Sequence, residues 1–171
     1  MHATSAFRRL TPDLMGSRRN VIRDMWDRIR PLPGGHRLFS RLVGLAAPYT
    51  GTMGAVVEEL ERGRSRVSLR DRWAVRNHLD CVHAIALANL AELTGNVALA
   101  YTIPDDARFI VAGLDIDYLK KARGTITGTC DCPEIDGSDR REYQVPVVMR
   151  DAGGDEVARA TLRTLVGPKK P

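Results

Sequence analysis

The sequence predicts an α+β fold in which an antiparallel sheet of about six strands wraps round one central buried helix. The helix is predicted by residues 82–103, which are almost all aliphatic, alanine or small polar and contain no proline. Two segments of alternating apolar and polar residues precede this stretch, and four follow it. Because a single helix separates the strands, the chain lacks the strand–helix alternation of a doubly wound parallel sheet.

Two short helices are predicted before the sheet, in an N-terminal extension of residues 1–49. We expect them to cap the main domain, residues 50–167, which is followed by a flexible tail at 168–171. Pro31 ends the first helix, and the second ends before Pro48. The apolar positions at helical spacing are Val21, Ile22, Met25, Trp26 and Ile29 in the first helix and Leu38, Phe39, Leu42 and Val43 in the second.

The strands are separated by recognisable turn sequences. Arg62–Gly63 separates the first two strands, and the segment DAGGDE predicts a hairpin between the last two. The segment CPEIDGSDRRE reads as a polar loop. The predicted strands span residues 53–61, 64–72, 108–120, 125–131, 143–150 and 156–166.

Charge is unevenly distributed along the chain. The net charge is +5, and the first 50 residues hold nine arginines against three aspartates. This region is a solvated helical face, a surface for an anionic partner, or a contact with an acidic neighbouring subunit. The PLPGG break fits a DNA-reading helix-turn-helix poorly, so nucleic acid is not an expected partner. No apolar run reaches the roughly 18 uncharged residues of a membrane span.

Three cysteines, Cys81, Cys130 and Cys132, are an odd number in a chain long enough to fold without disulfides. We therefore expect reduced thiols and a cytoplasmic protein. Cys130 and Cys132 alternate on a predicted strand and share a face, but two ligands do not make a zinc site. No metal is expected.

Glu92 stands out because it interrupts the apolar helix, where a carboxylate without a partner is costly to bury. Asn77 lies fifteen residues before it and His83 nine residues before it. This spacing resembles the central helix of hotdog-fold acyl-CoA thioesterases, in the branch of the phenylacetate-pathway and 4-hydroxybenzoyl-CoA enzymes. The resemblance extends more loosely over residues 50–166, including LDIDYLKKARGTITGT, which is similar to a strand pair of that family.

The resemblance implies hydrolysis of an acyl-CoA thioester, with coenzyme A as part of the substrate and no other cofactor. It implies that Glu92 is the general base or nucleophile and that Asn77 and His83 orient the acyl group or water. The backbone amide near Ala84 would face the thioester oxygen, where the helix dipole favours negative charge. This chain has Ala84 and Ile85 where the family has two glycines, and we expect Ile85 to turn toward the core.

Helical geometry separates two of these residues. Nine residues turn an α-helix by about 900°, so Glu92 and His83 lie on opposite sides. A site that uses both must combine two protomers, as the family's sites do, so we expect a homodimer or a dimer of dimers. Asn89 and Asn96 share the face of Glu92, and Asn96 is a candidate for holding the attacking water.

Lys120, Lys121, Arg123 and Gly124 occupy a turn between strands. They are either a solvated turn or the cations that meet the phosphates of coenzyme A. The few aromatic residues favour an aliphatic over an aryl acyl group.

Other readings remain open from the sequence. Glu92 could pair with an arginine at a subunit interface, His83 could be a buried structural histidine, and Asn77 could cap the helix. A hotdog protein that binds acyl-CoA without hydrolysing it, as a sensor or regulator, is the main alternative function. His78 precedes Glu92 by fourteen residues, the spacing of hotdog dehydratases, but the Pro- and Gly-rich segment of those enzymes is absent.

Overall fold

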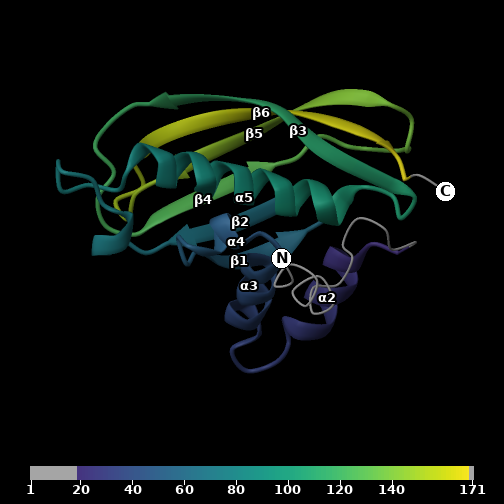
Figure 1. The fold of residues 1–171 in the computed structure, drawn as a ribbon, viewed down its shortest axis with the longest axis horizontal. Helices are drawn as coiled ribbons and strands as arrows, with labels where there is room; N and C mark the ends of the chain where they lie inside the picture. Colours follow the sequence, from purple (N-terminus) through teal and green to yellow (C-terminus); the bar gives the residue numbers. More distant parts are fainter. Residues whose placement is uncertain (1–18, 170–171) are drawn as a thin grey trace, which may run out of the picture.

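The computed structural model describes residues 19–169, which form a six-stranded antiparallel sheet curved round one long helix, α5 (Figure 1). The strand order is β1-β2-β4-β5-β6-β3. The predicted fold is therefore confirmed. The strands are β1 (Val56–Glu61), β2 (Arg64–Leu69), β3 (Ala107–Tyr118), β4 (Ile126–Asp131), β5 (Arg141–Arg150) and β6 (Glu156–Pro168); the helices are α2 (Val21–Ile29), α3 (Gly35–Ala46), α4 (Pro48–Gly51), the short 3-10 helix η1 (Trp73–Val75) and α5 (Ala84–Thr102).

Helix α5 approaches the sheet closely because two glycines lie at the contact. A Cβ at Gly128 of β4 would come within 2.6 Å of the Thr94 hydroxyl oxygen, and one at Gly95 would press on Leu162 of β6. The rest of this face is mostly aliphatic, and Leu90 and Leu99 are fully buried there, although Thr102 is also buried and its hydroxyl accepts from the Gly63 amide (2.8 Å). Close packing of this face supplies most of the hydrophobic core.

Helix α2 caps the C-terminal end of α5. The last carbonyls of a helix have no partner within the helix, and cations are favoured at that end. The Asn20 amide donates to the carbonyl oxygens of Ala100 (2.7 Å) and Ile103 (3.2 Å). The Arg23 guanidinium donates to the carbonyls of Tyr101 (3.0 and 2.9 Å) and Ile103 (2.8 Å). One arginine of the basic N-terminal region therefore has an internal role.

The N-terminal helices contribute aromatic residues to the hydrophobic core. Trp26 of α2 is buried, stacks on His36 and meets Phe39 of α3 edge-on. Ser40 of α3 joins this pair to the sheet, because its hydroxyl accepts a hydrogen bond from the Val57 amide of β1 (2.9 Å). Figure 1 shows α2 and α3 side by side below α5 and β1. The two helices are thus packed onto the sheet domain.

Most element boundaries agree with the sequence within a few residues, with some differences. Strands β1 and β2 are shorter than the predicted 53–61 and 64–72. Leu38 was expected to share a buried face but is 45% exposed. Strand β6 extends to Pro168, and the Lys169 amide donates to the Asp106 carbonyl (2.7 Å), so the prediction of a flexible tail is wrong for residues 168 and 169. Residues 170–171 and 1–18 lie outside the described residues.

Strand β3 forms one edge of the sheet. Within the described chain it pairs only with β6, so one side of a twelve-residue strand has unpaired backbone groups. Ile110 on this strand is 65% exposed. Long edge strands with apolar side chains are surfaces on which another chain can pair.

Helix α5 is long and apolar enough, by length and composition alone, to cross a membrane. In the fold it is the core helix of the sheet, and more than half of it is buried inside the protein. Burial of this kind is typical of the central helix of a globular domain.

We predict that Arg23→Ala lowers the free energy of unfolding by about 1.5–3 kcal/mol, because it removes charged hydrogen bonds from the end of α5. The matched control is Arg28→Ala on the same helix. Arg28 is exposed, so its change should stay within about 0.5 kcal/mol. Urea unfolding of both variants gives the comparison, and equal effects would show that the cap contributes nothing.

We also predict that Gly128→Ala costs about 1–3 kcal/mol, because the new methyl group meets the Thr94 hydroxyl. Gly167→Ala is the control, since a Cβ there meets nothing within 4 Å. The double variant Thr94→Ala, Gly128→Ala should be more stable than the sum of the single changes predicts. Strict additivity in thermal or urea unfolding would contradict this close contact.

Candidate functional site

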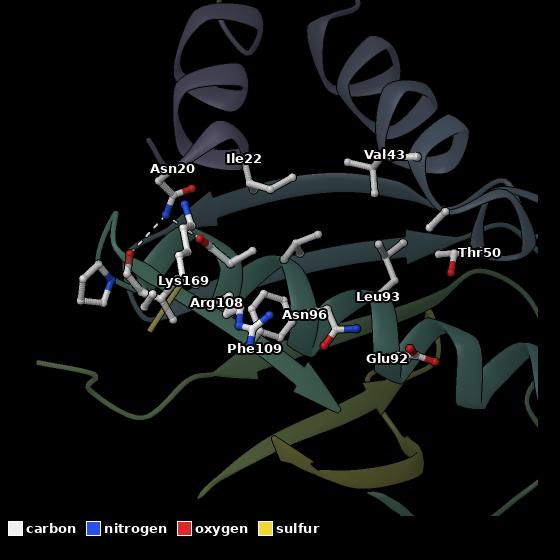
Figure 2. Close-up of a pocket in the computed structure, with 17 residues that line it drawn as sticks. Asn20, Ile22, Val43, Thr50, Glu92, Leu93, Asn96, Arg108, Phe109 and Lys169 are labelled. Atoms are coloured by element: carbon white, nitrogen blue, oxygen red, sulfur yellow. Dashed lines mark hydrogen bonds between the residues drawn. The ribbon is translucent and has the colours of Figure 1, made fainter. Parts of the chain in front are cut away.

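A pocket of about 240 Å³ lies between α5 and the N-terminal helices (Figure 2). One wall is a stripe of α5 that begins at Glu92 and ends at Ile103. Ile22 of α2 and Val43 of α3 point down onto this stripe, and Phe109 of β3 lies across from them. Most of the lining is apolar. This pocket is the concave, mostly apolar kind of site that binds small molecules.

Glu92 lies at one end of this pocket and is exposed in the single chain. The expectation that α5 is buried all round is therefore wrong for one stripe of the helix, on which Ala88 and Asn96 are also partly open. Among residues 19–169 no hydrogen bond or ion pair to the Glu92 carboxylate is present. The described chain itself thus supplies no structural partner for this acid.

Asn96 follows Glu92 by one helical turn and lines the same pocket, as its position on the helix predicted. Its side-chain oxygen is shielded from solvent and has no hydrogen-bond partner among the described residues. The side-chain oxygen of Asn89 is in the same state, and that residue is buried. Buried polar atoms are normally satisfied, so these two side-chain oxygens are exceptions for which the described chain supplies no partner.

The start of α5 forms a second cluster of polar groups. His83 is the N-cap, and its Nδ1 accepts a hydrogen bond from the Ile85 amide (3.0 Å). The ring therefore holds its proton on Nε2 when neutral. The Ala84 amide has no partner within the described part of the chain. It is one of the donors that a helix N-terminus offers to an anion.

Two expectations near this cluster are corrected. Ile85 does not turn to the core, because it is 53% exposed. Asn77 does not cap α5: it lies in the preceding turn, where its side-chain oxygen accepts from the Leu79 amide (2.9 Å) and the Cys81 thiol (3.3 Å). His78 is exposed in the same turn.

The basic turn after β3 packs against the start of α5. The Val82 amide donates to the Ala122 carbonyl (2.8 Å), and the Arg123 guanidinium donates to the Asp80 carbonyl (3.2 Å). Gly124, at a φ of 70°, donates its amide to Asp71 (2.9 Å). Arg76 beside Asp71 holds the pKa of that carboxyl below its usual range. These contacts fix the turn in place.

The charges in this turn are not equally available. The Lys120 ammonium lies 2.6 Å from Asp155 and 2.9 Å from Asp151, and these carboxylates raise its pKa. The positive charge of Lys120 is therefore already balanced by two carboxylates, so Lys120 is a weak candidate for binding a phosphate group. Lys121 and Arg123 are exposed, and Arg123 contacts the Asp80 carbonyl shortly before the start of α5.

The candidate residues thus form two groups on one helix. Glu92 and Asn96 belong to the pocket, whereas His83, Ala84 and the basic turn lie at the start of α5. Nine residues of helix separate Glu92 from His83 by about 13 Å along the axis. As the helical geometry predicted, the pocket that contains Glu92 does not contain His83.

Burial keeps two of the thiols protonated. It raises the pKa of Cys132 to about 11, and it raises the pKa of Cys130 further. Such thiols are poor nucleophiles and poor metal ligands at neutral pH. Residues 19–169 contain no cluster of three or more His, Cys, Asp or Glu side chains that could hold a metal ion.

The contribution of the N-terminal helices to the pocket was missed by the sequence reasoning, which treated them as an added cap. Ile22, Val43 and Thr50 line the pocket although they precede β1. Their apolar spacing predicted only that one helical face is buried. No local pattern indicates what that face covers.

The fold is that of several solved structures. A protein described only as "genomics APC5556" is 31% identical, with a TM-score of 0.76 over 86% of this chain and 98% of that one. A Pseudomonas aeruginosa protein of unknown function, described as a probable thioesterase, is 21% identical, with a TM-score of 0.68 over 80% and 97%. A thioesterase family protein from Silicibacter pomeroyi is 15% identical, with a TM-score of 0.64 over 75% and 96%.

These likenesses confirm the hotdog fold that the resemblance implied. No curated protein matches the chain. The family described as "Domain of unknown function (DUF4442)" matches residues 35–166, a range that begins with α3 and ends in β6. Since this match covers most of the sequence, the chain belongs to the DUF4442 family.

Proposed function

We propose that this protein hydrolyses acyl-CoA thioesters, with Glu92 as the general base or nucleophile. The observation that carries this proposal is an unpaired carboxylate at the end of an apolar pocket, on a helix that is otherwise apolar. Asn96 lines the same pocket one turn away, and this position supports a role in holding water. The fold shared with proteins described as thioesterases is consistent with this activity.

In the base route, Asn96 orients a water molecule and Glu92 takes its proton as the water oxygen attacks the thioester carbon. The carbonyl oxygen becomes an oxyanion, which backbone amides at a helix N-terminus stabilise. Collapse of this intermediate breaks the C–S bond, and the proton held by Glu92 passes to the departing thiolate. In the nucleophile route, a carboxylate oxygen of Glu92 attacks the thioester carbon, the C–S bond breaks and the thiolate leaves. Water then hydrolyses the acyl-glutamate anhydride, which releases the acid, restores Glu92 and supplies the proton that the thiolate takes up.

We propose further that the site is shared between two subunits. Glu92 and the Ala84 amide lie at different positions on one helix, so a single α5 does not bring both to one thioester. The unpaired edge of β3 offers a place where a second copy can add its own strand. In such a dimer, the start of α5 from one copy would complete the pocket of the other.

We predict that Glu92→Gln lowers kcat/KM for acyl-CoA hydrolysis by about a hundredfold or more, because the amide keeps the size but loses the basic group. The control is Glu61→Gln, an exposed glutamate at the end of β1 outside the pocket. Thiol release from a panel of acyl-CoAs measures both variants. Equal activity of Glu92→Gln and the wild type would assign Glu92 a structural role.

Subunit complementation tests the shared site. We predict that Glu92→Gln and His83→Ala are each inactive but that their refolded mixture recovers roughly a quarter of wild-type activity, since half of the dimers hold one intact site of two. Mixing two preparations of Glu92→Gln is the control. No recovery despite mixed dimers, verified with tagged subunits, would place the whole site in one chain.

A binding protein without hydrolytic activity remains the second candidate, and one observation favours it. Ala84 and Ile85 replace the glycines of the related enzymes, and the Ile85 amide is already bonded to His83. The start of α5 therefore has one fewer free amide for an oxyanion. Wild-type protein that binds acyl-CoA in calorimetry but releases no thiol across the panel would support this function instead.

A further inference from the structure

We propose that the pocket binds a straight aliphatic acyl chain of about eight carbons, with its thioester at Glu92 and its methyl end near Ala100. The inference rests on the proposed function for the position of the thioester. It adds the substrate class and the part of the protein that selects it. That part is the surface between α5 and the N-terminal helices.

The shape of the pocket follows the helix. Its α5 wall includes Glu92, Asn96, Ala100 and Ile103, which recur every three or four residues and form one stripe. This stripe is about 16 Å long, since eleven steps of about 1.5 Å separate Glu92 from Ile103. The pocket is therefore elongated along α5, with the acid at one end. An extended chain fits this shape better than a compact ring.

The chemistry of the lining also favours a hydrocarbon. Between the two ends, the pocket is bounded by Leu93 and Val97 of α5, Ile22 and Val43 of the covering helices, and Phe109 of β3. Asn20 lies at the pocket, but its amide is used to cap the Ala100 and Ile103 carbonyls. Apart from Asn96 and Thr50, the lining between the two ends is apolar, so it suits a hydrocarbon better than the amides of the pantetheine arm of coenzyme A.

The volume and the far end limit the chain length. A pocket of about 240 Å³ has room for about eight groups the size of a water molecule or a methylene. Arg108 and Lys169 lie beyond Ala100, and they donate to the Pro168 and Arg19 carbonyls respectively. A longer chain would pass Ile103 and bring its methyl end against these cationic groups.

The test is the chain-length profile of Ala100→Leu. The wild type should show a maximum of kcat/KM near octanoyl-CoA when straight chains from acetyl to palmitoyl are compared with benzoyl-CoA and phenylacetyl-CoA. Three added carbons at position 100 should shift this maximum to shorter chains and lower octanoyl turnover by roughly tenfold or more, since each buried methylene is worth about fourfold in binding. Butanoyl turnover should change less than about twofold, because a short chain does not reach that far.

Two further variants keep the result interpretable. Val43→Ala enlarges the roof of the pocket and should move the maximum to longer chains. Ala152→Leu, in the exposed β5–β6 turn, adds the same side chain elsewhere and should leave the profile unchanged. An unchanged profile in both pocket variants, or a wild-type maximum at acetyl or aryl groups, would overturn the inference.

Measurements of acyl-CoA binding test the pocket assignment independently of the proposed hydrolysis. Calorimetry with Glu92→Gln should give an affinity for acyl-CoA that rises up to about eight carbons and then levels off. If the wild type hydrolyses nothing but this length dependence is present and is lost in Ala100→Leu, the pocket assignment stands and the proposed reaction fails. If hydrolysis occurs with no length dependence in either measurement, the reaction stands and the pocket assignment fails.

Discussion

The capping of α5 by α2 is the interaction on which the arrangement of the molecule depends. An apolar helix inside a sheet ends with carbonyl groups that neither the helix nor the sheet can satisfy. Asn20 and Arg23 supply donors to three of these carbonyls, across about eighty residues of sequence. By doing so they hold α2 and α3 over the open stripe of α5. The pocket exists because these helices are fixed at that distance.

The two sides of α5 meet opposite requirements. Toward the sheet, Gly128 and Gly95 allow contacts so close that an added methyl group would clash. Toward the N-terminal helices, Glu92 and Asn96 border a space of about 240 Å³. A carboxylate on the first side would be desolvated at a cost of several kcal/mol. On the second side it stays hydrated, and this explains how an acid interrupts such an apolar sequence without destabilising the fold.

The order and type of the elements were predictable because they depend on local patterns. Alternation located the strands, and the run of apolar residues located α5. Three features were not local. The exposure of Glu92 depends on which stripe of α5 the sheet leaves uncovered, and a helix apolar on nearly all sides does not indicate this. His83 caps α5 in place of Asn77. Asn77 lies in a turn before the helix, and its side-chain oxygen is used within that turn by Leu79 and Cys81. The partners of Asn20 and Arg23 are too distant in sequence to be inferred.

The position of Lys169 has a consequence for the order in which the protein is assembled during synthesis. Lys169 lines the pocket, and its ammonium group donates to the Arg19 carbonyl, so the two ends of the described chain meet there. Strand β3 likewise finds its neighbour β6 only some forty residues later. Contacts of such long separation form slowly, since loop closure precedes any gain in packing. A chain that is still being synthesised therefore has an incomplete pocket until β6 and Lys169 have emerged from the ribosome.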